Sequence, residues 1–268
     1  MKSKSIFLFF AAIILLLPTI ALAADKPAKS PSRKEWKLVW KDDFKGKKID
    51  TRSWTRCKAG TSDWDRHMSD LDSLCRVEKG VLQLWGINTP EGYDERQFIT
   101  GGVCSKGLRS VKNGRFEVRA KLGCATGFWP AIWLMPDSKI GWPYGGEIDI
   151  MEHLSYEDIA YQTVHTPHTL YKREPIIQHY VTVPIKKDEF NVYAVELSES
   201  EVTFYVNGEK TFTYSKMEPT PEGQFPFADH PFYIILSAQL GGSWVGNVGP
   251  QDLPVKMEID YVRVYERK

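Results

Sequence analysis

The sequence is poor in cysteine and nearly free of net charge. Its 268 residues include four Cys, and 35 Lys and Arg stand against 34 Asp and Glu, which leaves a formal net charge of +1. Balanced charge provides no general attraction to nucleic acid or to an anionic membrane surface, so we expect neither as a partner. Because 42% of the residues are hydrophobic and the 20 Gly follow no fixed period, disordered and collagen-like chains are also excluded.

A long hydrophobic run occurs only at the start of the chain. Lys2 and Lys4 precede an apolar run over residues 6–17, and the small residues Ala-Leu-Ala follow at 21–23. This order of basic, apolar and small residues is typical of a secretory signal peptide. Pro18 ends the run short of the ~20 apolar residues that a membrane span needs.

We therefore predict a signal peptide over residues 1–23, a polar tether over residues 24–34 and one domain over residues 35–268. No linker rich in Pro or Ser and no internal repeat divides the last segment. The mature protein is expected to be monomeric, to lack a membrane span, and to be secreted, periplasmic or held at the cell surface.

The few cysteines, Cys57, Cys75, Cys104 and Cys124, would meet oxidising conditions after export. They allow three pairings into two disulfides, and the spacing does not choose among them. Free buried thiols are the other interpretation. A structural zinc site is not indicated, because the sequence contains no Cys-x-x-Cys.

Amphipathic helices of several turns are also absent, which argues against a TIM barrel. Residues 115–122 instead alternate apolar and charged side chains, so that Phe116, Val118, Ala120 and Leu122 share one face of a strand. Similar runs occur at residues 81–87, 191–197, 201–206, 232–239 and 257–265. About ten to fourteen short strands of this kind predict an all-β sandwich or barrel.

Three carboxyl groups lie close together in a strand-like segment, residues 145–154. Glu147 and Asp149 are two residues apart and therefore project from the same face of an extended strand. Their mutual repulsion would weaken an ordinary strand, which points to a function. Glu152 would face the other way unless a β-bulge near residues 150–151 returns it to the face of the first two.

Such a bulge allows the spacing of Glu147 and Glu152 to be estimated. Four strand steps of ~3.3 Å separate their backbones by about 13 Å, and two side chains that lean together span roughly 8 Å of it. The remaining ~5 Å is the carboxyl separation of a retaining glycosidase rather than an inverting one. An acidic edge strand and a calcium-binding face are the other interpretations.

Further motifs make the sequence resemble one enzyme family. The segment EIDIME at 147–152 is preceded by WPAIW at 129–133 and by Trp142-Pro143, and IDYVRVY follows at 259–265. Together these resemble glycoside hydrolase family 16, in its laminarinase-like branch with the bulged motif. The resemblance implies a concanavalin A-like β-jelly-roll sandwich with a concave substrate cleft. It also implies a secreted endo-β-glycosidase that acts with retention on polysaccharides or complex glycans and requires no cofactor.

The resemblance further implies roles for the residues of these motifs. Glu147 is the expected nucleophile, and Glu152 is the expected general acid and then base. Asp149 is expected to hydrogen-bond the nucleophile and to help keep the acid protonated. Trp129 and Trp142 are expected to line sugar subsites, because sugars present flat apolar faces to aromatic rings.

Four further residues are candidates for contacts with the glycan. Arg119 is predicted beside the nucleophile, although an ion pair with Glu117 would also explain it. His165 follows the carboxylate segment and is either a sugar contact or a structural histidine. Gln239 and Trp244 belong to a segment that resembles a family loop at the cleft rim, where Trp244 could instead cap the sandwich.

The remaining tryptophans divide into cleft and core candidates. Trp64 is predicted to form a distinctive subsite, with core packing as the alternative. Trp133 has the strand parity of Trp129, but a core position fits it equally well. Trp40 and Trp54 are predicted to pack inside the sandwich.

The segment after the early tryptophans bears on the substrate. Where β-1,3-glucanases of this branch carry Asn-Asn-Glu and a tyrosine-rich stretch, this chain reads GTSDWDRHMS at 60–69. Such loops determine specificity, and this region resembles that of family members that cut β-galactosides within mucin O-glycans or keratan-like chains, which implies a substrate of that type. An endo-β-1,3(4)-glucanase is the alternative enzyme, and a non-catalytic lectin-like module is the alternative of another class.

Two acidic residues loosely fit a structural calcium site of some family members. Asp43 lies near the first strand and Asp260 in the last. Two carboxylates alone do not establish calcium binding, which takes six to eight oxygen ligands.

Overall fold

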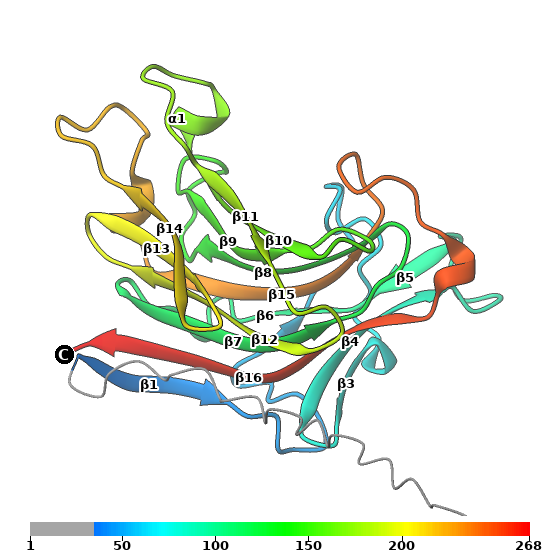
Figure 1. The fold of residues 1–268 in the computed structure, drawn as a ribbon. Helices are drawn as coiled ribbons and strands as arrows, with labels where there is room; N and C mark the ends of the chain where they lie inside the picture. Colours follow the sequence, from blue (N-terminus) through cyan, green and yellow to red (C-terminus); the bar gives the residue numbers. More distant parts are fainter. Residues whose placement is uncertain (1–34) are drawn as a thin grey trace, which may run out of the picture.

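The computed structural model describes residues 35–268 as two antiparallel β-sheets packed face to face (Figure 1). The predicted signal peptide, residues 1–23, and tether, residues 24–34, lie outside the described residues. Over residues 35–268, no helix has the length and apolar character required to cross a membrane. The prediction of an all-β sandwich is confirmed.

The outer sheet contains nine strands. They are β1 (Trp36–Asp42), β3 (Cys75–Glu78), β4 (Val81–Asn88), β5 (Phe98–Thr100), β7 (Gly114–Leu122), β12 (Phe190–Leu197), β13 (Glu201–Val206), β14 (Glu209–Ser215) and β16 (Val255–Arg267). Their order is β14-β13-β12-β7-β16-β4-β3, with β1 paired to β16 and β5 paired to β4. This sheet forms the side of the sandwich that faces away from the site described below.

The inner sheet contains seven strands. They are β2 (Thr55–Arg56), β6 (Gly102–Cys104), β8 (Phe128–Pro136), β9 (Glu147–Glu152), β10 (Ile159–His165), β11 (Tyr180–Pro184) and β15 (Phe232–Leu240). Their order is β11-β10-β9-β8-β15-β6-β2, so β9 has a partner on both sides. In Figure 1 the segment with α1 (Pro167–Leu170) rises on one side of this sheet, and the orange connection after β15 rises on the other.

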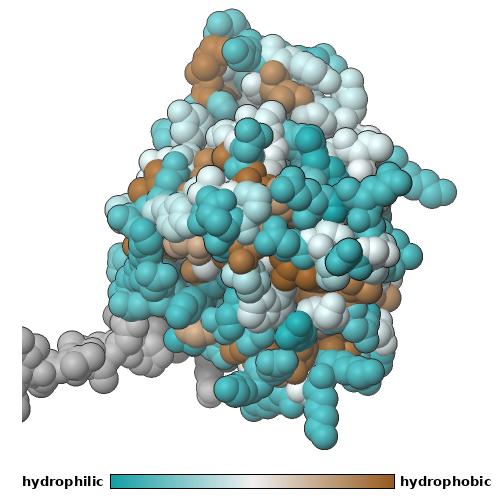
Figure 2. All heavy atoms as spheres, turned by 90° about the vertical axis from the view of Figure 1, so that its right-hand side faces the viewer, coloured by the Kyte–Doolittle hydropathy of each residue, from teal (hydrophilic) through white to brown (hydrophobic). Residues whose placement is uncertain are grey.

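The core fills the space between the two sheets. On β7, Phe116, Val118 and Ala120 are buried, as the alternation in the sequence predicts. They belong to one apolar cluster with residues of the inner sheet such as Ile132 and Ile148. Figure 2 shows that the face at the right of Figure 1 is mostly hydrophilic, with only scattered hydrophobic areas.

The structure contains more strands than the sequence predicts, sixteen over residues 35–268. The additional strands include β2, β5 and β6, which are two or three residues long. A segment of that length cannot display an alternating pattern, so sequence periodicity gives no signal for it. Trp54 is buried and its ring lies 5.3 Å from the ring of Trp40, in agreement with their predicted place in the sandwich.

All four cysteines are free thiols. Cys57 and Cys104 are hydrogen-bonded to each other where β2 meets β6. Cys75 lies in the core, and its thiol contacts the carbonyl oxygen of Gly102 at 3.6 Å. Of the two interpretations, free thiols agree with the structure, and none of the three possible disulfide pairings is formed.

Candidate active site

A β-bulge interrupts the carboxylate strand β9. Asp149 pairs with Trp133 of β8, whereas Met151 pairs with the preceding residue of β8, Ile132. Ile150 is therefore the extra residue, and both Ile150 and Met151 are fully buried in the core. The bulge predicted from the sequence is confirmed at the predicted position.

Because of the bulge, Glu147, Asp149 and Glu152 all line one cavity on the inner sheet. The cavity has a volume of about 720 Å³. Asp149 and Glu152 are buried, with 2% and 8% of their surface exposed, and Glu147 is partly buried. The three predicted catalytic carboxyls are thus together at one place, on the concave side of the sandwich.

The entry into β9 depends on a glycine. Gly146 has a φ of +77°, in the left-handed region that L side chains rarely adopt. A Cβ atom at this position would lie 2.5 Å from a ring carbon of Phe227. Glycine therefore allows the chain to turn and to approach the core directly before Glu147.

Two tryptophans donate hydrogen bonds to the outer pair of carboxyls. The Trp142 indole N–H donates to Oε2 of Glu147 at 2.6 Å. The Trp129 indole N–H donates to Oε1 of Glu152 at 2.9 Å. Both tryptophans line the cavity, as predicted, and each also fixes the side chain of one glutamate.

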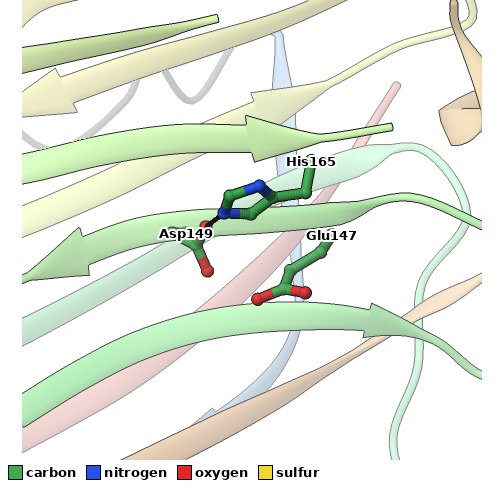
Figure 3. A group of neighbouring side chains, drawn as sticks. All are labelled: Glu147, Asp149 and His165. Atoms are coloured by element: carbon green, nitrogen blue, oxygen red, sulfur yellow. Dashed lines mark ion pairs between the residues drawn. The ribbon is translucent and has the colours of Figure 1, made fainter. Parts of the chain in front are cut away.

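His165 lies beside the central carboxyl. Its Nε2 is 3.3 Å from Oδ2 of Asp149, and Figure 3 shows the imidazole ring, Asp149 and Glu147 facing the same space. One ligand atom of each of the three residues lies within 4.8 Å of those of the others, a spacing that could hold a metal ion. Both carboxyls already have nitrogen neighbours, the Trp142 indole N–H at Glu147 and His165 Nε2 at Asp149, which suits proton chemistry better than metal binding.

Burial controls the ionisation of these acids. Loss of hydration raises the pKa of Glu147 to about 8, with a further contribution from the charge of Asp149. Burial likewise raises the pKa of Asp149 to about 7, against the effect of its hydrogen bond with Glu147. The pKa of Glu152 lies well above the ordinary value, because of burial and then the Asp149 charge. The site therefore retains protons at neutral pH.

An apolar wall covers the cavity beyond the carboxyls. The rings of Trp64 and Trp133 meet edge to face at 4.9 Å, and both residues line the cavity. Asp63 Oδ2 accepts hydrogen bonds from the backbone N–H and the hydroxyl of Ser243, at 2.7 and 2.6 Å. The segment at 60–69 is thereby joined to the loop after β15, and it forms part of the cavity wall.

The two remaining cleft candidates differ in position. Gln239 is buried and lines the cavity. Trp244 is 46% exposed at the rim, where its ring lies 5.5 Å from that of Trp129 and 4.9 Å from that of Tyr161. Trp244 therefore supports the Trp129 side chain from outside the cavity.

Arg119 is not beside Glu147, and the prediction of that position is wrong. It lies on β7 of the outer sheet, where its Nη1 donates to Oδ2 of Asp260 at 2.8 Å. The alternate residues of β7 face the core, so Arg119 points to the opposite side of the sandwich from the cavity. The alternative partner, Glu117, instead pairs with Arg115 at 3.0 Å.

The two predicted calcium ligands are each paired with cations. Asp43 contacts Lys41 at 2.5 Å and Arg263 at 3.7 Å, and Asp260 pairs with Arg119. Neither belongs to a group of three potential metal ligands within residues 35–268. This arrangement gives no support to the expected calcium site.

Three basic residues that the sequence analysis did not identify also line the cavity. They are Arg56, Lys58 and Lys106. Arg56 pairs with Asp72 at 2.9 Å, and Lys58 pairs with Asp70 at 3.3 Å. Arg56 and Lys58 are two residues apart, so they would share one face of an extended strand. This is the one signal in the sequence, and strand β2, with two residues, is too short to make it recognisable.

The chain is similar to known proteins in both sequence and fold. The sequence profile of Glycosyl hydrolases family 16 matches residues 76–263. A keratan-sulfate endo-1,4-beta-galactosidase of Sphingobacterium multivorum is 34% identical over 236 residues, which are 87% of this chain and 56% of that longer protein. This chain thus spans little more than half the length of that relative.

Solved structures share the fold. The laminarinase from Rhodothermus marinus has a TM-score of 0.79 at 30% identity, and the match covers 88% of this chain and 100% of that one. A structure described as "Prominent members of the human gut microbiota express endo-acting O-glycanases to initiate mucin breakdown" has a TM-score of 0.73 at 32% identity, covering 85% and 98%. A profile that matches most of the described chain, and relatives similar over nearly all of it, show that the protein belongs to glycosyl hydrolases family 16 and is a glycoside hydrolase.

Proposed function

We propose that this protein is an endo-β-glycosidase that cleaves internal bonds of galactose-containing glycans, of the mucin O-glycan or keratan type. The observation that carries the chemistry is the bulged strand β9, which turns Glu147, Asp149 and Glu152 into one cavity. A lectin has no use for three buried carboxyls, two of which have their pKa raised by the charge of the third, Asp149. Glycans of this kind lie outside cells, in keeping with the expected export of the protein.

In the first step, Glu147 attacks the anomeric carbon of the sugar at the cleaved bond. Glu152 donates its proton to the glycosidic oxygen, which leaves with the bonding electron pair as a sugar hydroxyl. A glycosyl ester of Glu147 remains. In the second step, Glu152 takes a proton from water, the oxygen of that water attacks the anomeric carbon, and the ester bond breaks to release Glu147.

The surroundings of the carboxyls suit these roles. The high pKa of Glu152 keeps the acid protonated before the first step. Glu147 and Asp149 share a hydrogen bond. The Trp142 N–H lowers the pKa of Glu147, so it favours the negative charge on the nucleophile.

The choice of substrate rests on the wall of the cavity. The segment that departs from the glucanase pattern, at 60–69, is the one that carries Trp64 to the cavity and contacts the loop after β15. The galactosidase and O-glycanase relatives support a galactoside. The similarity to a laminarinase favours an endo-β-1,3(4)-glucanase as the second candidate.

A substrate panel tests this proposal. Purified protein is incubated with keratan-type glycan, mucin O-glycans, laminarin, mixed-linkage glucan, agarose and carrageenan, and the products are identified by mass spectrometry. We expect oligosaccharides from keratan-type glycan or mucin O-glycans, and a loss of at least ~10³-fold in rate with Glu147→Gln. Cleavage of laminarin alone would favour the second candidate, and full activity of Glu147→Gln would exclude the proposed mechanism.

A further inference from the structure

Gln239 carries an unused polar atom at the wall of the cavity. Only 2% of the residue is exposed, and it belongs to the lining of the cavity that holds Glu152. Its Nε2 donates to the hydroxyl of Ser237 at 2.9 Å. Its Oε1 is buried and has no hydrogen-bond partner.

The neighbouring side chains hold this amide in place. Ser237 is fully buried, and its Oγ also accepts a hydrogen bond from the Trp133 indole N–H at 3.1 Å. The three side chains therefore form a short hydrogen-bonded chain with the free oxygen of Gln239 at its end. A fixed polar group among the apolar side chains of a cavity wall confers orientation and specificity on a ligand.

The register of the inner sheet locates Gln239 relative to the acid. Gln239 pairs with Trp129 on β8, and Ser237 pairs with Ala131, which in turn pairs with Glu152. Gln239 is thus on the second strand from β9, about 10 Å away at ~4.8 Å per strand. It faces the part of the cavity on the β15 side of the bond that Glu152 would protonate.

A buried acceptor without a partner is unfavourable, and a bound sugar can supply the missing donor. Sugar hydroxyls are dense along a glycan and can both donate and accept. We propose that Gln239 is a specificity-determining residue, whose amide hydrogen-bonds one hydroxyl of the sugar bound on the β15 side of the cleaved bond. This inference rests on the proposed function, since it assigns a contact within that site.

The contact gives the enzyme a means to choose among sugars. A site built to hydrogen-bond a hydroxyl rejects an analogue without it, because the protein group is then left unpaired. Sugars that differ only in the orientation of one hydroxyl are discriminated in the same way. Ser237 acts as a positioning residue, because it sets the orientation of the amide.

Gln239→Met, which keeps the approximate size but removes the amide, tests the inference. The substrates are the N-acetyllactosamine tetrasaccharide and laminaritetraose, each with a set of analogues in which single hydroxyls are replaced by hydrogen. With the better tetrasaccharide, we expect wild-type kcat/KM to fall about 10–100-fold for one deoxy position. In Gln239→Met, kcat/KM on the intact sugar falls by a similar factor, and removal of that same hydroxyl causes no further loss.

Matched variants separate this role from a structural one. Gln83→Met changes a buried glutamine of the outer sheet, outside the cavity, and is expected to leave kcat/KM and the deoxy profile unchanged. Ser237→Ala frees the Gln239 amide to rotate and is expected to weaken the preference for the critical hydroxyl only in part.

Two failures are distinguishable in this experiment. If the wild type is active, two results would overturn the role of Gln239 alone. In the first, Gln239→Met retains the kcat/KM of the wild type. In the second, each deoxy position lowers the kcat/KM of that variant further by the same factor. A wild type that hydrolyses neither tetrasaccharide and no polysaccharide of the panel would overturn the proposed function, and this contact with it.

Discussion

At the scale of single residues, the acids of the cavity lower the stability of the folded chain. Glu152 is 8% exposed, and burial raises its pKa well above the ordinary value of 4.5. The folded protein therefore binds this proton more tightly than the unfolded chain. Relative to a neutral residue of the same shape, Glu152 does not lower the free energy of unfolding below pH 4.5. It lowers that free energy increasingly as the pH rises toward the folded-state pKa.

Glu152→Gln should therefore stabilise the protein at high pH. We expect equal free energies of unfolding for variant and wild type at pH 4, and a higher free energy of unfolding for the variant at pH 8, because the wild type must then ionise a buried acid. Urea denaturation at both pH values measures the difference. Glu91→Gln, at an exposed turn, serves as the control without a gain at either pH. A Glu152→Gln variant less stable than wild type at pH 8 would show that Glu152 is stabilised as an anion.

Individual residues were predictable where a local motif fixed their place. The spacing of Glu147, Asp149 and Glu152 led to their common face and to the bulge. Arg119 was misplaced because its parity shows only that it faces away from the core, not which sheet it joins. The sequence does not identify Arg56 and Lys106, because only the pairing of distant strands brings both residues to the cavity.

At the scale of elements, the short turn before β9 controls where the catalytic strand starts. Gly146 combines a φ of +77° with a Cβ position 2.5 Å from the ring of Phe227, a core residue. Gly92 has nearly the same φ, +76°, but nothing lies within 4 Å of its Cβ position. Substitutions at the two glycines therefore distinguish the effect of backbone strain from that of steric conflict.

Gly146→Ala should be more damaging than Gly92→Ala. Strain at positive φ costs about 1 kcal/mol in both variants, and the conflict with Phe227 adds about 1–3 kcal/mol in Gly146→Ala alone. Displacement of Glu147 should also lower kcat, whereas Gly92→Ala should retain wild-type kcat. Thermal unfolding and kinetics on the preferred glycan measure both effects. Equal behaviour of the two variants would mean that the turn tolerates a side chain at 146.

Elements with a strong local signal formed as the sequence predicts. The Asn207-Gly208 pair predicts a two-residue hairpin, and both residues adopt positive φ, 52° and 87°, between β13 and β14. The alternation at 115–122 became β7. Strands β2 and β6 carry no such pattern. They are defined by their pairing, β2 with β6 and β6 with β15.

At the scale of the whole molecule, the cavity is assembled from segments far apart in the chain. Its lining comes from residues near β2, from β8 and β9, and from β15. The sheet order places these strands side by side on one face of the sandwich. Sequence periodicity predicts that a strand exists and which side chains share a face, but it contains no information on which strands become neighbours.

The assignment of opposite roles to Glu147 and Glu152 is tested most directly by azide rescue. Each glutamate is replaced by Ala, and each variant is incubated with azide and a dinitrophenyl β-glycoside of the preferred sugar. NMR then determines the anomeric configuration of the glycosyl azide formed. We expect the α-azide from Glu147→Ala, because azide replaces the nucleophile, and the β-azide from Glu152→Ala, because azide attacks the Glu147 ester. An α-azide from Glu152→Ala, or a β-azide from Glu147→Ala, would reverse the two roles.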